Sequence, residues 1–583
     1  MMDKNTLDLS NDGYMSPELA RLYNQIADDI RQEYIDLVNN LSKKHRHDRD
    51  WFVTPFACRN TYVCPVFEEV VRIFFIREVV DRNIVDGGVK TIIVDSPFMA
   101  KVMKLHLPNS VQIIAKQSKA QYYLFYILSV FSGLIKYIIS TLLRYLSFKV
   151  ASLITGTNHD DNYSEPMVVM ETYVYSNSFD KGDFSDRHFH EIKSHLNESQ
   201  ANKLLYIPTF YQVRNSFTLY LKAFKSKTNF LFVEKHISLV DILYPILHPF
   251  RLSYGELNVN IRDIDISQMV NHFLLRYSTH TSSLYAILKY RFCCNLKEDS
   301  SIAINQVVRW YENQEVDHGS ILGWRAYSNS LRVTGYMDFF ASSNYLCAYP
   351  IPIEHDLRMT PDFIGVLGEG LIERHKKYCD ALNIGVVPSF RFAIPTVNEQ
   401  RMNKFTDEIK VLVTLPISQN HINTVIKIIS GLSGINDSHR APILFVIKPH
   451  PASTFSLDER CLERNNVQYT VVEIEDSLST LLMNVNLILS TASSTLVEAI
   501  MYGVPAILVS STQSLRENVI PEFVPDNLWE EVYSAEELHE ALVEYKQSSN
   551  QLTVDELNLL NSKIVGLQPN KKNVLTLFSD FDY

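Results

Sequence analysis

Residues 485–509 read VNLILSTASSTLVEAIMYGVPAILV, and this stretch decides the fold prediction. An apolar run, Val485–Leu489, ends in the small polar residues Ser490–Ser494. A helix is predicted next, and Gly503 supplies the residue type that commonly ends a helix. A second apolar run, Val504–Val509, follows directly. Short apolar runs that alternate with helices indicate a parallel sheet with helical crossovers.

The same alternation extends upstream through the second half of the chain. The predicted strands are Ile409–Leu415, Pro442–Ile447 and Val467–Ile474, and the predicted helices are Asn420–Ser430 and Ser477–Asn484. This order predicts a doubly wound α/β domain, which binds its ligands at the carboxyl ends of its strands.

The first half of the chain carries a second set of strand-like runs between helical patterns. They are Lys90–Asp95, Met167–Met170, Leu204–Ile207 and Asn229–Val233. We expect the first two to belong to one α/β domain, and we place the linker between domains in the proline-rich zone 335–361. Because 583 residues exceed what one hydrophobic core supports, two domains are predicted, 1–360 and 361–583.

Composition and charge exclude some functional classes. The net charge of -11 argues against nucleic-acid binding, because the chain has no basic excess to neutralise phosphates. The seven cysteines are scattered and lack CxxC pairing, which argues against a disulfide framework or a zinc site and favours a reducing cytosol. The first residues, MMDKNTLDLSNDG, have no basic and apolar pattern of a secretory signal.

One apolar segment interrupts the first half. Residues 122–143 read YYLFYILSVFSGLIKYIISTLL and contain one charged residue, Lys136, which would cost about 2.5–3.5 kcal/mol at a membrane centre. A single crossing would separate the strands on either side, so we expect segment 120–154 to associate with a membrane from one side. It would do so as an in-plane helix or as a hairpin broken near Gly133–Lys136. The alternative is a buried pair of core helices.

Two polar motifs follow predicted strands of the second half. Lys448-Pro449-His450-Pro451 comes after one strand, and its cationic side chains can contact a phosphate, which His450 can protonate as it leaves. The second motif begins a helix, where backbone N–H groups and the helix dipole favour an anion. Its candidate binding residues are Ser490, Thr491, Ser493, Ser494 and Thr495, with Glu498 one turn later for ribose hydroxyls.

Each motif has an ordinary structural explanation as well. A lone KPHP is commonly a turn, and SxxSS before a helix is ordinary N-capping. Two anion-binding elements at strand ends of one sheet favour a phosphorylated ligand over either explanation alone.

These residues carry a resemblance. KPHP at 448–451 with STASSTLVEAIMYGVPAI at 490–507 resembles the donor-binding half of GT-B glycosyltransferases of bacterial surface polysaccharide synthesis, chiefly capsule Kdo transferases and sialyl- and polysialyltransferases. Those families place an HP motif and a Ser/Thr-rich motif around the phosphate of a CMP-sugar. The first half resembles surface carbohydrate biosynthesis proteins through ETYVYSNSFDKGDFSDRHF at 171–189 and WYENQ at 310–314. Similar HP elements also occur in CDP-glycerol phosphotransferases.

The resemblance implies two Rossmann-like domains, with acceptor binding in 1–360 and nucleotide-sugar binding in 361–583. It also implies a carboxylate base in the first domain, for which Glu312 is the first candidate and Asp186 the second, although the families' acidic-acidic-glycine pattern is missing. Arg187 and Arg325 are candidates to clamp a sugar carboxylate. The alternative for each of these four residues is a surface salt bridge or a buried structural pair. No metal or other cofactor is expected, because helix amides and cationic side chains would carry the leaving phosphate.

The resulting hypothesis is a cytoplasmic enzyme, peripheral or monotopic at the inner face of a bacterial membrane. It would transfer an acidic sugar, Kdo or a nonulosonic acid, from a CMP-sugar to a glycan or lipid-linked glycan. A transferase that uses a nucleoside-diphosphate sugar or a CDP-polyol, and a non-catalytic glycan-assembly protein, are the alternatives.

Overall fold

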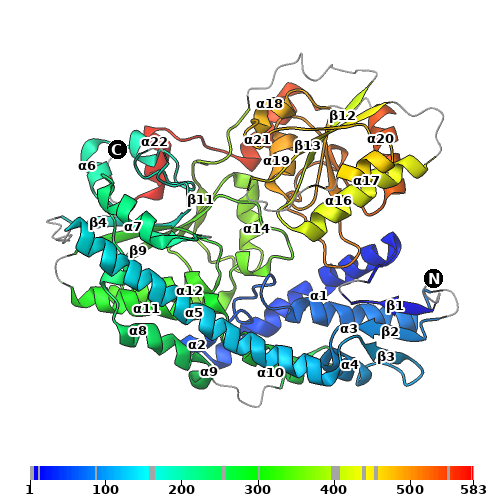
Figure 1. Ribbon diagram of the computed structural model, residues 1–583, viewed down its shortest axis with the longest axis horizontal. Coiled ribbons are helices and arrows are strands. Elements are labelled where there is room, and N and C mark those ends of the chain that lie inside the picture. Colours follow the sequence, from blue (N-terminus) through cyan, green and yellow to red (C-terminus); the bar gives the residue numbers. More distant parts are fainter. Residues whose placement is uncertain are drawn as a thin grey trace.

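The computed structural model describes residues 5–581 apart from 11–12, 86–87, 157–164, 181, 212, 253–257, 300–301, 396–407, 436–441, 452–456, 458, 548–551 and 580. Three parallel sheets form the framework of this part of the chain (Figure 1). Two of them have six strands each, and the third has three.

The second half forms one doubly wound parallel sheet, as predicted. Its strands, in spatial order, are β14 (Tyr469–Val471), β13 (Ile443–Lys448), β12 (Ile409–Thr414), β15 (Leu487–Ser490), β16 (Ala506–Val509) and β17 (Trp529–Val532). β15 and β16 are buried along their whole length, which explains their continuous apolar sequences. The helices of this half are α16 (Gln419–Gly431), α17 (Glu459–Arg464), α18 (Leu478–Leu482), α19 (Ser494–Met501), α20 (Ala535–Gln547) and α21 (Val554–Ile564).

The first half contributes the other six-stranded parallel sheet. Its spatial order is β11 (Ile384–Val386), β10 (Phe363–Val366), β9 (Arg332–Met337), β8 (Ile304–Trp310), β4 (Met167–Val174) and β5 (Leu204–Phe210). The helices between residues 198 and 376 are α6 (Glu198–Asn202), α7 (Ser216–Lys225), α8 (Leu239–Leu243), α9 (His248–Arg251), α10 (Ser267–Tyr277), α11 (Thr281–Glu298), α12 (Glu315–Tyr327), α13 (Pro352–Asp356) and α14 (Ile372–Lys376). The chain therefore has the two Rossmann-like sheets that the sequence predicted.

The change from one sheet to the other lies later in the chain than predicted. β10 and β11 extend the first sheet beyond residue 360, and the next strand, β12, belongs to the second. The zone 335–361, predicted as the linker, instead contains the end of β9 and α13 and is largely buried. Pro352 lies in the first turn of α13, and Pro361 lies just before β10. Both positions tolerate proline.

A third sheet corrects the predicted grouping of the early strands. β1 (Thr6–Asp8), β2 (Thr91–Val94) and β3 (Gln112–Ala115) pair in parallel, apart from β4. With α1 (Pro17–Lys44), α2 (Arg49–Phe52), α3 (Val66–Asp81) and α4 (Pro97–Lys104) they share a separate hydrophobic core. Thr91–Asp95 and Met167–Met170, which were expected to belong to one α/β domain, lie in different sheets, because a strand pattern does not specify its partner.

The run Asn229–Val233 is also not a strand of either large sheet. It makes a single parallel bridge, from Phe230 to Tyr206 beside β5, and a 3-10 turn begins at Val233. Its apolar side chains are buried against aromatic neighbours instead of continuing a ladder. Burial of a short apolar run therefore explains its composition without strand pairing.

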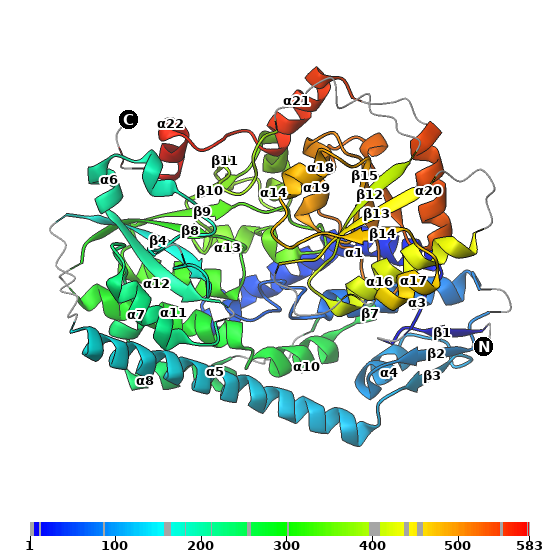
Figure 2. The same cartoon turned by 45° about the horizontal axis from the view of Figure 1, so that its top comes forward.

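The apolar segment of the first half forms one unbroken helix, α5 (Lys119–Thr155), and neither a hairpin nor a buried helix pair. Only 11% of its most apolar 18-residue window is buried. α5 packs along α7, α10 and α11, and Figure 2 shows it running along the lower edge of the molecule. Gly133 permits this approach, since a Cβ there would lie 2.3 Å from the Thr279 carbonyl oxygen.

The end of the chain returns to the first sheet. α22 (Lys571–Val574) is followed by Phe578 and Phe581, whose stacked rings join the hydrophobic cluster around β4 and β5. Gln306 of β8 donates to the Leu577 carbonyl at 2.8 Å. The C-terminal segment is therefore a second connection between the two large sheets, in addition to the segment between β11 and β12.

Candidate functional site

The carboxyl ends of three neighbouring strands bring the two sequence motifs together. β12 lies between β13 and β15, so the loop with His450 and the start of α19 flank the end of β12. The Ser490 Oγ donates to the Thr414 carbonyl at 2.7 Å, and the hydroxyls of Thr414 and Thr495 lie 2.9 Å apart. These hydrogen bonds fix the relative position of the two strand ends.

The start of α19 uses part of its hydroxyl motif to build itself. Ser493 is the N-cap, and its Oγ accepts from the Thr495 amide at 3.3 Å and from the Thr495 hydroxyl at 3.0 Å. Ser490 is fully buried and Thr491 nearly so. Capping therefore accounts for Ser493, whereas the Ser494 hydroxyl bonds to a residue outside the motif, Arg391. The helix dipole adds partial positive charge at this point.

Arg391, in the segment that connects the two large sheets, reaches the start of α19. Its Nη2 donates to the Ser494 Oγ at 3.1 Å. Arg187, in the loop after β4, lies with its guanidinium 5.0 Å from the ring centre of Tyr175. Both arginine side chains are exposed, and their charges act on His450, so the three side chains lie near one another.

The charge of these arginines affects two imidazoles. Burial, with Arg187 and Arg391, lowers the pKa of His450, and the same causes lower the pKa of His188 to about 3. The neutral form of both rings is therefore favoured at pH 7. A bound phosphate would reverse part of this effect, because an anion favours the protonated imidazole. Phosphate binding therefore favours protonation of His450.

Two further carboxyl groups, of the buried Asp338 and the half-buried Glu498, interact electrostatically with Arg391. Burial raises the pKa of Asp338, which follows β9, to about 6, and that of Glu498 on α19 to about 7. Arg391 opposes both shifts, and Asp338 adds to that of Glu498. The Ser389 Oγ donates to the Asp338 Oδ1 at 2.9 Å and accepts from the Arg391 amide at 3.2 Å. Asp338 thereby fixes the turn that presents Arg391.

Lys448 is directed away from this space. Its Nζ donates to the carbonyl oxygens of Ile474 at 2.7 Å and Glu473 at 3.4 Å. The ammonium group therefore ties the end of β13 to the turn after β14. His450 is the KPHP residue whose pKa is lowered by the charges of Arg187 and Arg391.

Glu312, the first candidate base, lies in the loop that follows β8, at the carboxyl edge of the first-half sheet. Its carboxylate accepts from Trp310 Nε1 at 2.6 Å, Gln314 Nε2 at 2.7 Å and the Tyr345 hydroxyl at 2.8 Å. Burial raises its pKa despite these three donors. The Trp310 ring also lies 4.0 Å from that of His188, which connects Glu312 to the loop of Arg187.

Buried ion pairs hold the Glu312 loop in place. Arg309 of β8 pairs with Glu171 of β4 at 3.0 Å and with Asp317 at 2.6 Å. The other Asp317 oxygen accepts from the Gln314 amide at 2.8 Å and the Glu312 amide at 3.2 Å. This chain of contacts explains the polar residues of ETYVYSN and WYENQ as parts of one scaffold.

Asp186 accepts hydrogen bonds that hold its own loop against β4. Its Oδ1 accepts from the Thr172 hydroxyl at 2.8 Å and from the amides of His188 at 2.9 Å and Phe189 at 3.2 Å. Burial raises its pKa to about 6. The carboxyl group folds the loop that presents Arg187 and His188, and these contacts favour a structural role over direct contact with substrate.

Arg325 is not brought to the site. It lies in the last turn of α12, and its two terminal nitrogens each lie 3.0 Å from an Asp362 oxygen. Its guanidinium also donates to the Leu331 carbonyl at 2.7 Å. These bonds occupy the guanidinium as a structural pair, which is the alternative given for it above.

Sequence reasoning missed Arg391, His188 and Asp338. Asp338 had a usable signal, because it directly follows the apolar run of β9 at a strand end. His188 lies next to two residues that were chosen. Arg391 lies outside every recognised motif, and only the folding of the connecting segment brings it to α19.

No protein-family model and no curated protein matches the chain. Solved structures that are similar to it include MurG from Acinetobacter baumannii, at 10% identity over 71% of this chain and 99% of that chain, with a TM-score of 0.38. MnaA from S. aureus with UDP is 10% identical over 70% and 94%, with a TM-score of 0.37. The glycosyltransferase SnogD from Streptomyces nogalater is 12% identical over 71% and 98%, with a TM-score of 0.34. Similarities with such low TM-scores carry no argument about activity or ligand.

The raised pKa of Glu498 predicts a pH-dependent effect of Glu498→Gln on stability. Because the folded protein holds this proton more tightly than the unfolded chain, the contribution of Glu498 is full below about pH 4.5 and is lost as the pH rises through about 7. Glutamine removes that loss. The melting temperature of Glu498→Gln relative to the unsubstituted protein is expected to increase from pH 5 to pH 8, measured without ligand. The exposed Glu463→Gln is the control, and a difference that stays constant with pH would contradict the assignment.

Proposed function

We propose that the chain is a GT-B glycosyltransferase that binds the phosphate of a nucleotide-sugar donor between its two large sheets. The observations that support the proposal are the hydrogen bond from Arg391 to Ser494 at the start of α19 and the effect of the Arg187 and Arg391 charges on the pKa of His450. Cationic side chains and helix N–H groups are the donors that bind phosphate in proteins. The carboxyl ends of parallel strands are also where such folds bind ligands.

The proposed donor is a CMP-activated acidic sugar, Kdo or a nonulosonic acid. One phosphate next to Arg391 and α19 leaves Arg187 for the carboxylate of the sugar. Glu498 is suited to hydrogen-bond ribose hydroxyls in either protonation state, because its pKa is raised to about 7. This assignment, like the resemblance to capsule Kdo transferases and sialyltransferases, also rests on the KPHP and STASST motifs. The proposed acceptor is a glycan of surface polysaccharide, capsule or lipopolysaccharide synthesis.

In the proposed reaction the acceptor hydroxyl attacks the anomeric carbon while Glu312 takes its proton. The bond between the anomeric carbon and the phosphate oxygen breaks, and its electron pair leaves with the nucleotide. Arg391, the α19 amides and His450 stabilise the charge that develops on that oxygen. The raised pKa of Glu312 makes its carboxylate a stronger base than an exposed one, and its three donors fix its orientation.

The donor proposal predicts that CMP raises the melting temperature of the protein, because a ligand that binds only the folded state stabilises it. Arg391→Ala and His450→Ala are each expected to weaken CMP binding at least tenfold in calorimetry, since a hydrogen bond to a charged group contributes about 1.5–3 kcal/mol. Arg332→Ala, at the start of β9 and therefore at the opposite edge of its sheet, is the control. CDP, UDP and GDP are measured in parallel.

Each outcome of this experiment is decisive. A preference for a diphosphate would move the assignment to a transferase with a nucleoside-diphosphate or CDP-polyol donor. No nucleotide binding by the folded protein would contradict the enzyme proposal and favour a glycan-assembly protein. Glu312→Gln is expected to retain CMP binding and to slow release of CMP from CMP-Kdo or CMP-N-acetylneuraminic acid by roughly 100- to 10,000-fold. Retained turnover in that variant would exclude Glu312 as the base.

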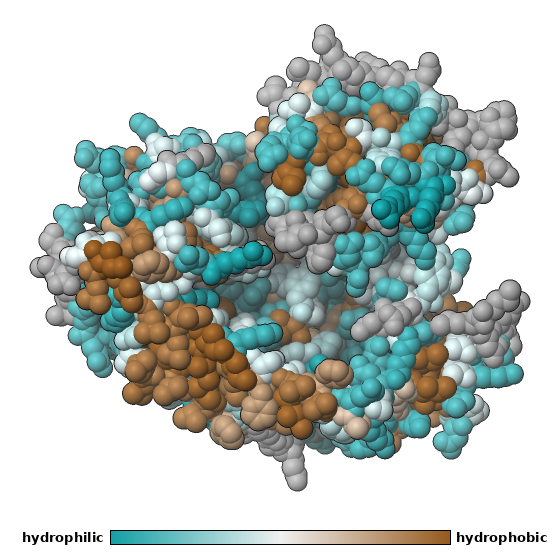
Figure 3. Space-filling view, in the orientation of Figure 1, coloured by the Kyte–Doolittle hydropathy of each residue, from teal (hydrophilic) through white to brown (hydrophobic). Residues whose placement is uncertain are grey.

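We also propose that the protein attaches to the inner face of a bacterial cytoplasmic membrane through an apolar surface on α5, α8 and α9. Exposed apolar side chains of α5 continue into a second group that the sequence did not suggest: Leu239, Val240, Leu243, Leu247 and Phe250. Figure 3 shows these apolar residues gathered on one face of the molecule. Because α5 packs along the first sheet's helices over its length, the proposal is attachment in the plane of the membrane and not a crossing.

This surface predicts binding to vesicles of phosphatidylethanolamine and phosphatidylglycerol in sedimentation. The double substitution Leu128→Glu with Phe131→Glu, at side chains that are 52% and 57% exposed, is expected to reduce partitioning at least tenfold. Leu559→Glu, at a 60% exposed leucine of α21, is the matched control. Equal partitioning of both variants would contradict attachment through α5.

A further inference from the structure

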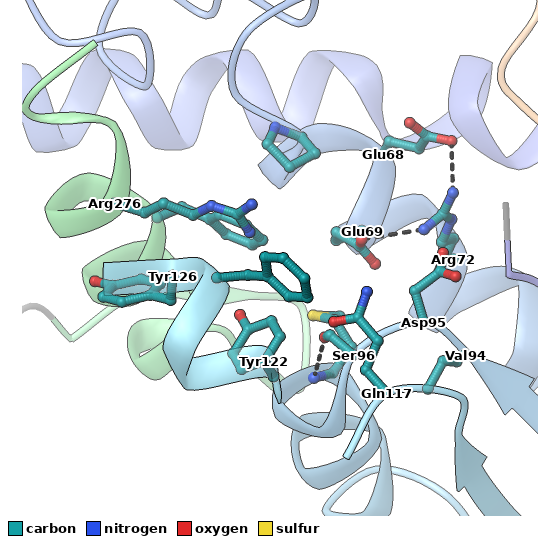
Figure 4. A pocket seen from close by; sticks show the side chains of 14 residues that line it. Glu68, Glu69, Arg72, Val94, Asp95, Ser96, Gln117, Tyr122, Tyr126 and Arg276 are labelled. Carbon is teal, nitrogen blue, oxygen red and sulfur yellow. Dashed lines mark hydrogen bonds and ion pairs between the residues drawn. The ribbon is translucent and has the colours of Figure 1, made fainter. Parts of the chain in front are cut away.

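A separate cavity of about 300 Å³ lies at the carboxyl edge of the small third sheet (Figure 4). Asp95 and Ser96 follow β2, and Gln117 follows β3, so polar loop residues form one wall. Helix α3, the start of α5 and α10 form the rest. None of these residues belongs to the site between the two large sheets.

The cavity contains a carboxylate with an unused hydrogen-bonding atom. Glu69 of α3 is 9% exposed, and its Oε1 accepts from Arg72 Nη1 at 3.1 Å. Its Oε2 is buried and has no hydrogen-bond partner among the residues that the structure describes. The Nε of Arg276 on the opposite wall is also buried and has no hydrogen-bond partner among the described residues. Figure 4 shows both side chains directed into the cavity. A buried polar atom left unpaired costs about 1–3 kcal/mol, so these atoms are suited to a polar ligand.

The lining defines the chemistry of that ligand. Three carboxylates, of Glu68, Glu69 and Asp95, face two guanidinium groups, of Arg72 and Arg276, so the excess charge is negative. An anionic ligand is therefore disfavoured, and hydroxyl or amine donors suit the carboxylate oxygens. The rings of Tyr122, Phe125 and Tyr126 line the remaining side. Aromatic faces beside hydrogen-bonding carboxylates match a sugar ring, which has apolar C–H faces and polar hydroxyl edges.

Two smaller cavities border this one in sequence, because they share lining residues. A cavity of about 70 Å³ shares Pro65 and Glu68 with the first and reaches Tyr345, the residue that donates to Glu312. A third, of about 30 Å³, shares Leu515 and Glu517 with the second and reaches Thr491 at the end of β15. The shared residues show that each cavity borders the next, from the start of α5 to the end of β15.

We infer that the cavity around Glu69 binds an uncharged or amine-bearing sugar unit of the acceptor glycan, at a distance from the reacting end. The acceptor role rests on the proposed glycosyltransferase function, whereas binding of a sugar does not. The glycan would extend from Glu69 past Tyr345 toward Glu312, and a lipid at its other end would lie on the exposed apolar face of α5. A lipid-carried glycan and a free glycan present the same sugar to the cavity.

The test uses the full-length protein and saturation-transfer NMR with glucose, galactose, N-acetylglucosamine and glucosamine. At least one of these sugars is expected to bind, and Glu69→Gln and Gln117→Ala are each expected to weaken that binding at least tenfold. Gln117 is exposed in a loop, so its substitution leaves the fold intact even if Glu69→Gln does not. Glu78→Gln on the same helix, outside the cavity and paired with Arg82, is the control.

CMP binding by the same samples separates the two proposals. Loss of sugar binding with CMP binding intact in both cavity variants supports the inference, and sugar binding without any CMP binding would overturn only the donor proposal. Binding of none of the four sugars, or equal binding by both cavity variants, would overturn the inference. Vesicles that carry the best-bound sugar as a dialkyl glycoside then distinguish a lipid-carried glycan from a free one. If these vesicles recruit the protein more strongly than plain vesicles do, and if the difference depends on Glu69, the glycan is carried by a lipid.

Discussion

Arg391 occupies the point on which the proposed chemistry depends, between the carboxyl ends of the two large sheets. Its side chain bonds to Ser494 on α19, and its backbone amide bonds to Ser389, which Asp338 holds. The carboxyl groups of Asp338 and Glu498 interact electrostatically with this guanidinium, and burial raises their pKa values to about 6 and about 7. Proton uptake by these groups leaves Arg391 with less opposing negative charge, which favours an incoming phosphate.

Two other parts of the first half complete the proposed arrangement around Arg391: the ion pairs of Arg309 and helix α5. The ion pairs of Arg309 with Glu171 and Asp317 orient the loop that carries Glu312. Helix α5 lies along the same half with its apolar side chains exposed, and the cavity of Glu69 lies at its beginning. The proposed donor site, base, sugar cavity and membrane surface thus lie on neighbouring elements.

Local chemistry explains which parts were predictable from the sequence. The buried strands of the second sheet are continuous apolar runs, and Gly503 adopts the positive φ of 70° expected where a helix ends. Strand partners were not predictable, as β2 shows, because pairing in parallel sheets depends on long-range contacts. For the same reason the prediction chose Lys448 and Arg325, whose charges bond to local carbonyls and to Asp362, and missed Arg391. Spacing identifies a residue type at a strand end but not the direction of its side chain.

The most direct test of the central claim is a crystal structure of the protein with the nucleotide that stabilises it most. The account predicts that a phosphate oxygen lies within hydrogen-bonding distance of the Arg391 guanidinium and of a backbone amide in the first turn of α19, with His450 at the same phosphate. A nucleotide bound elsewhere, with Arg391 still bonded to Ser494 and no contact to α19, would contradict it.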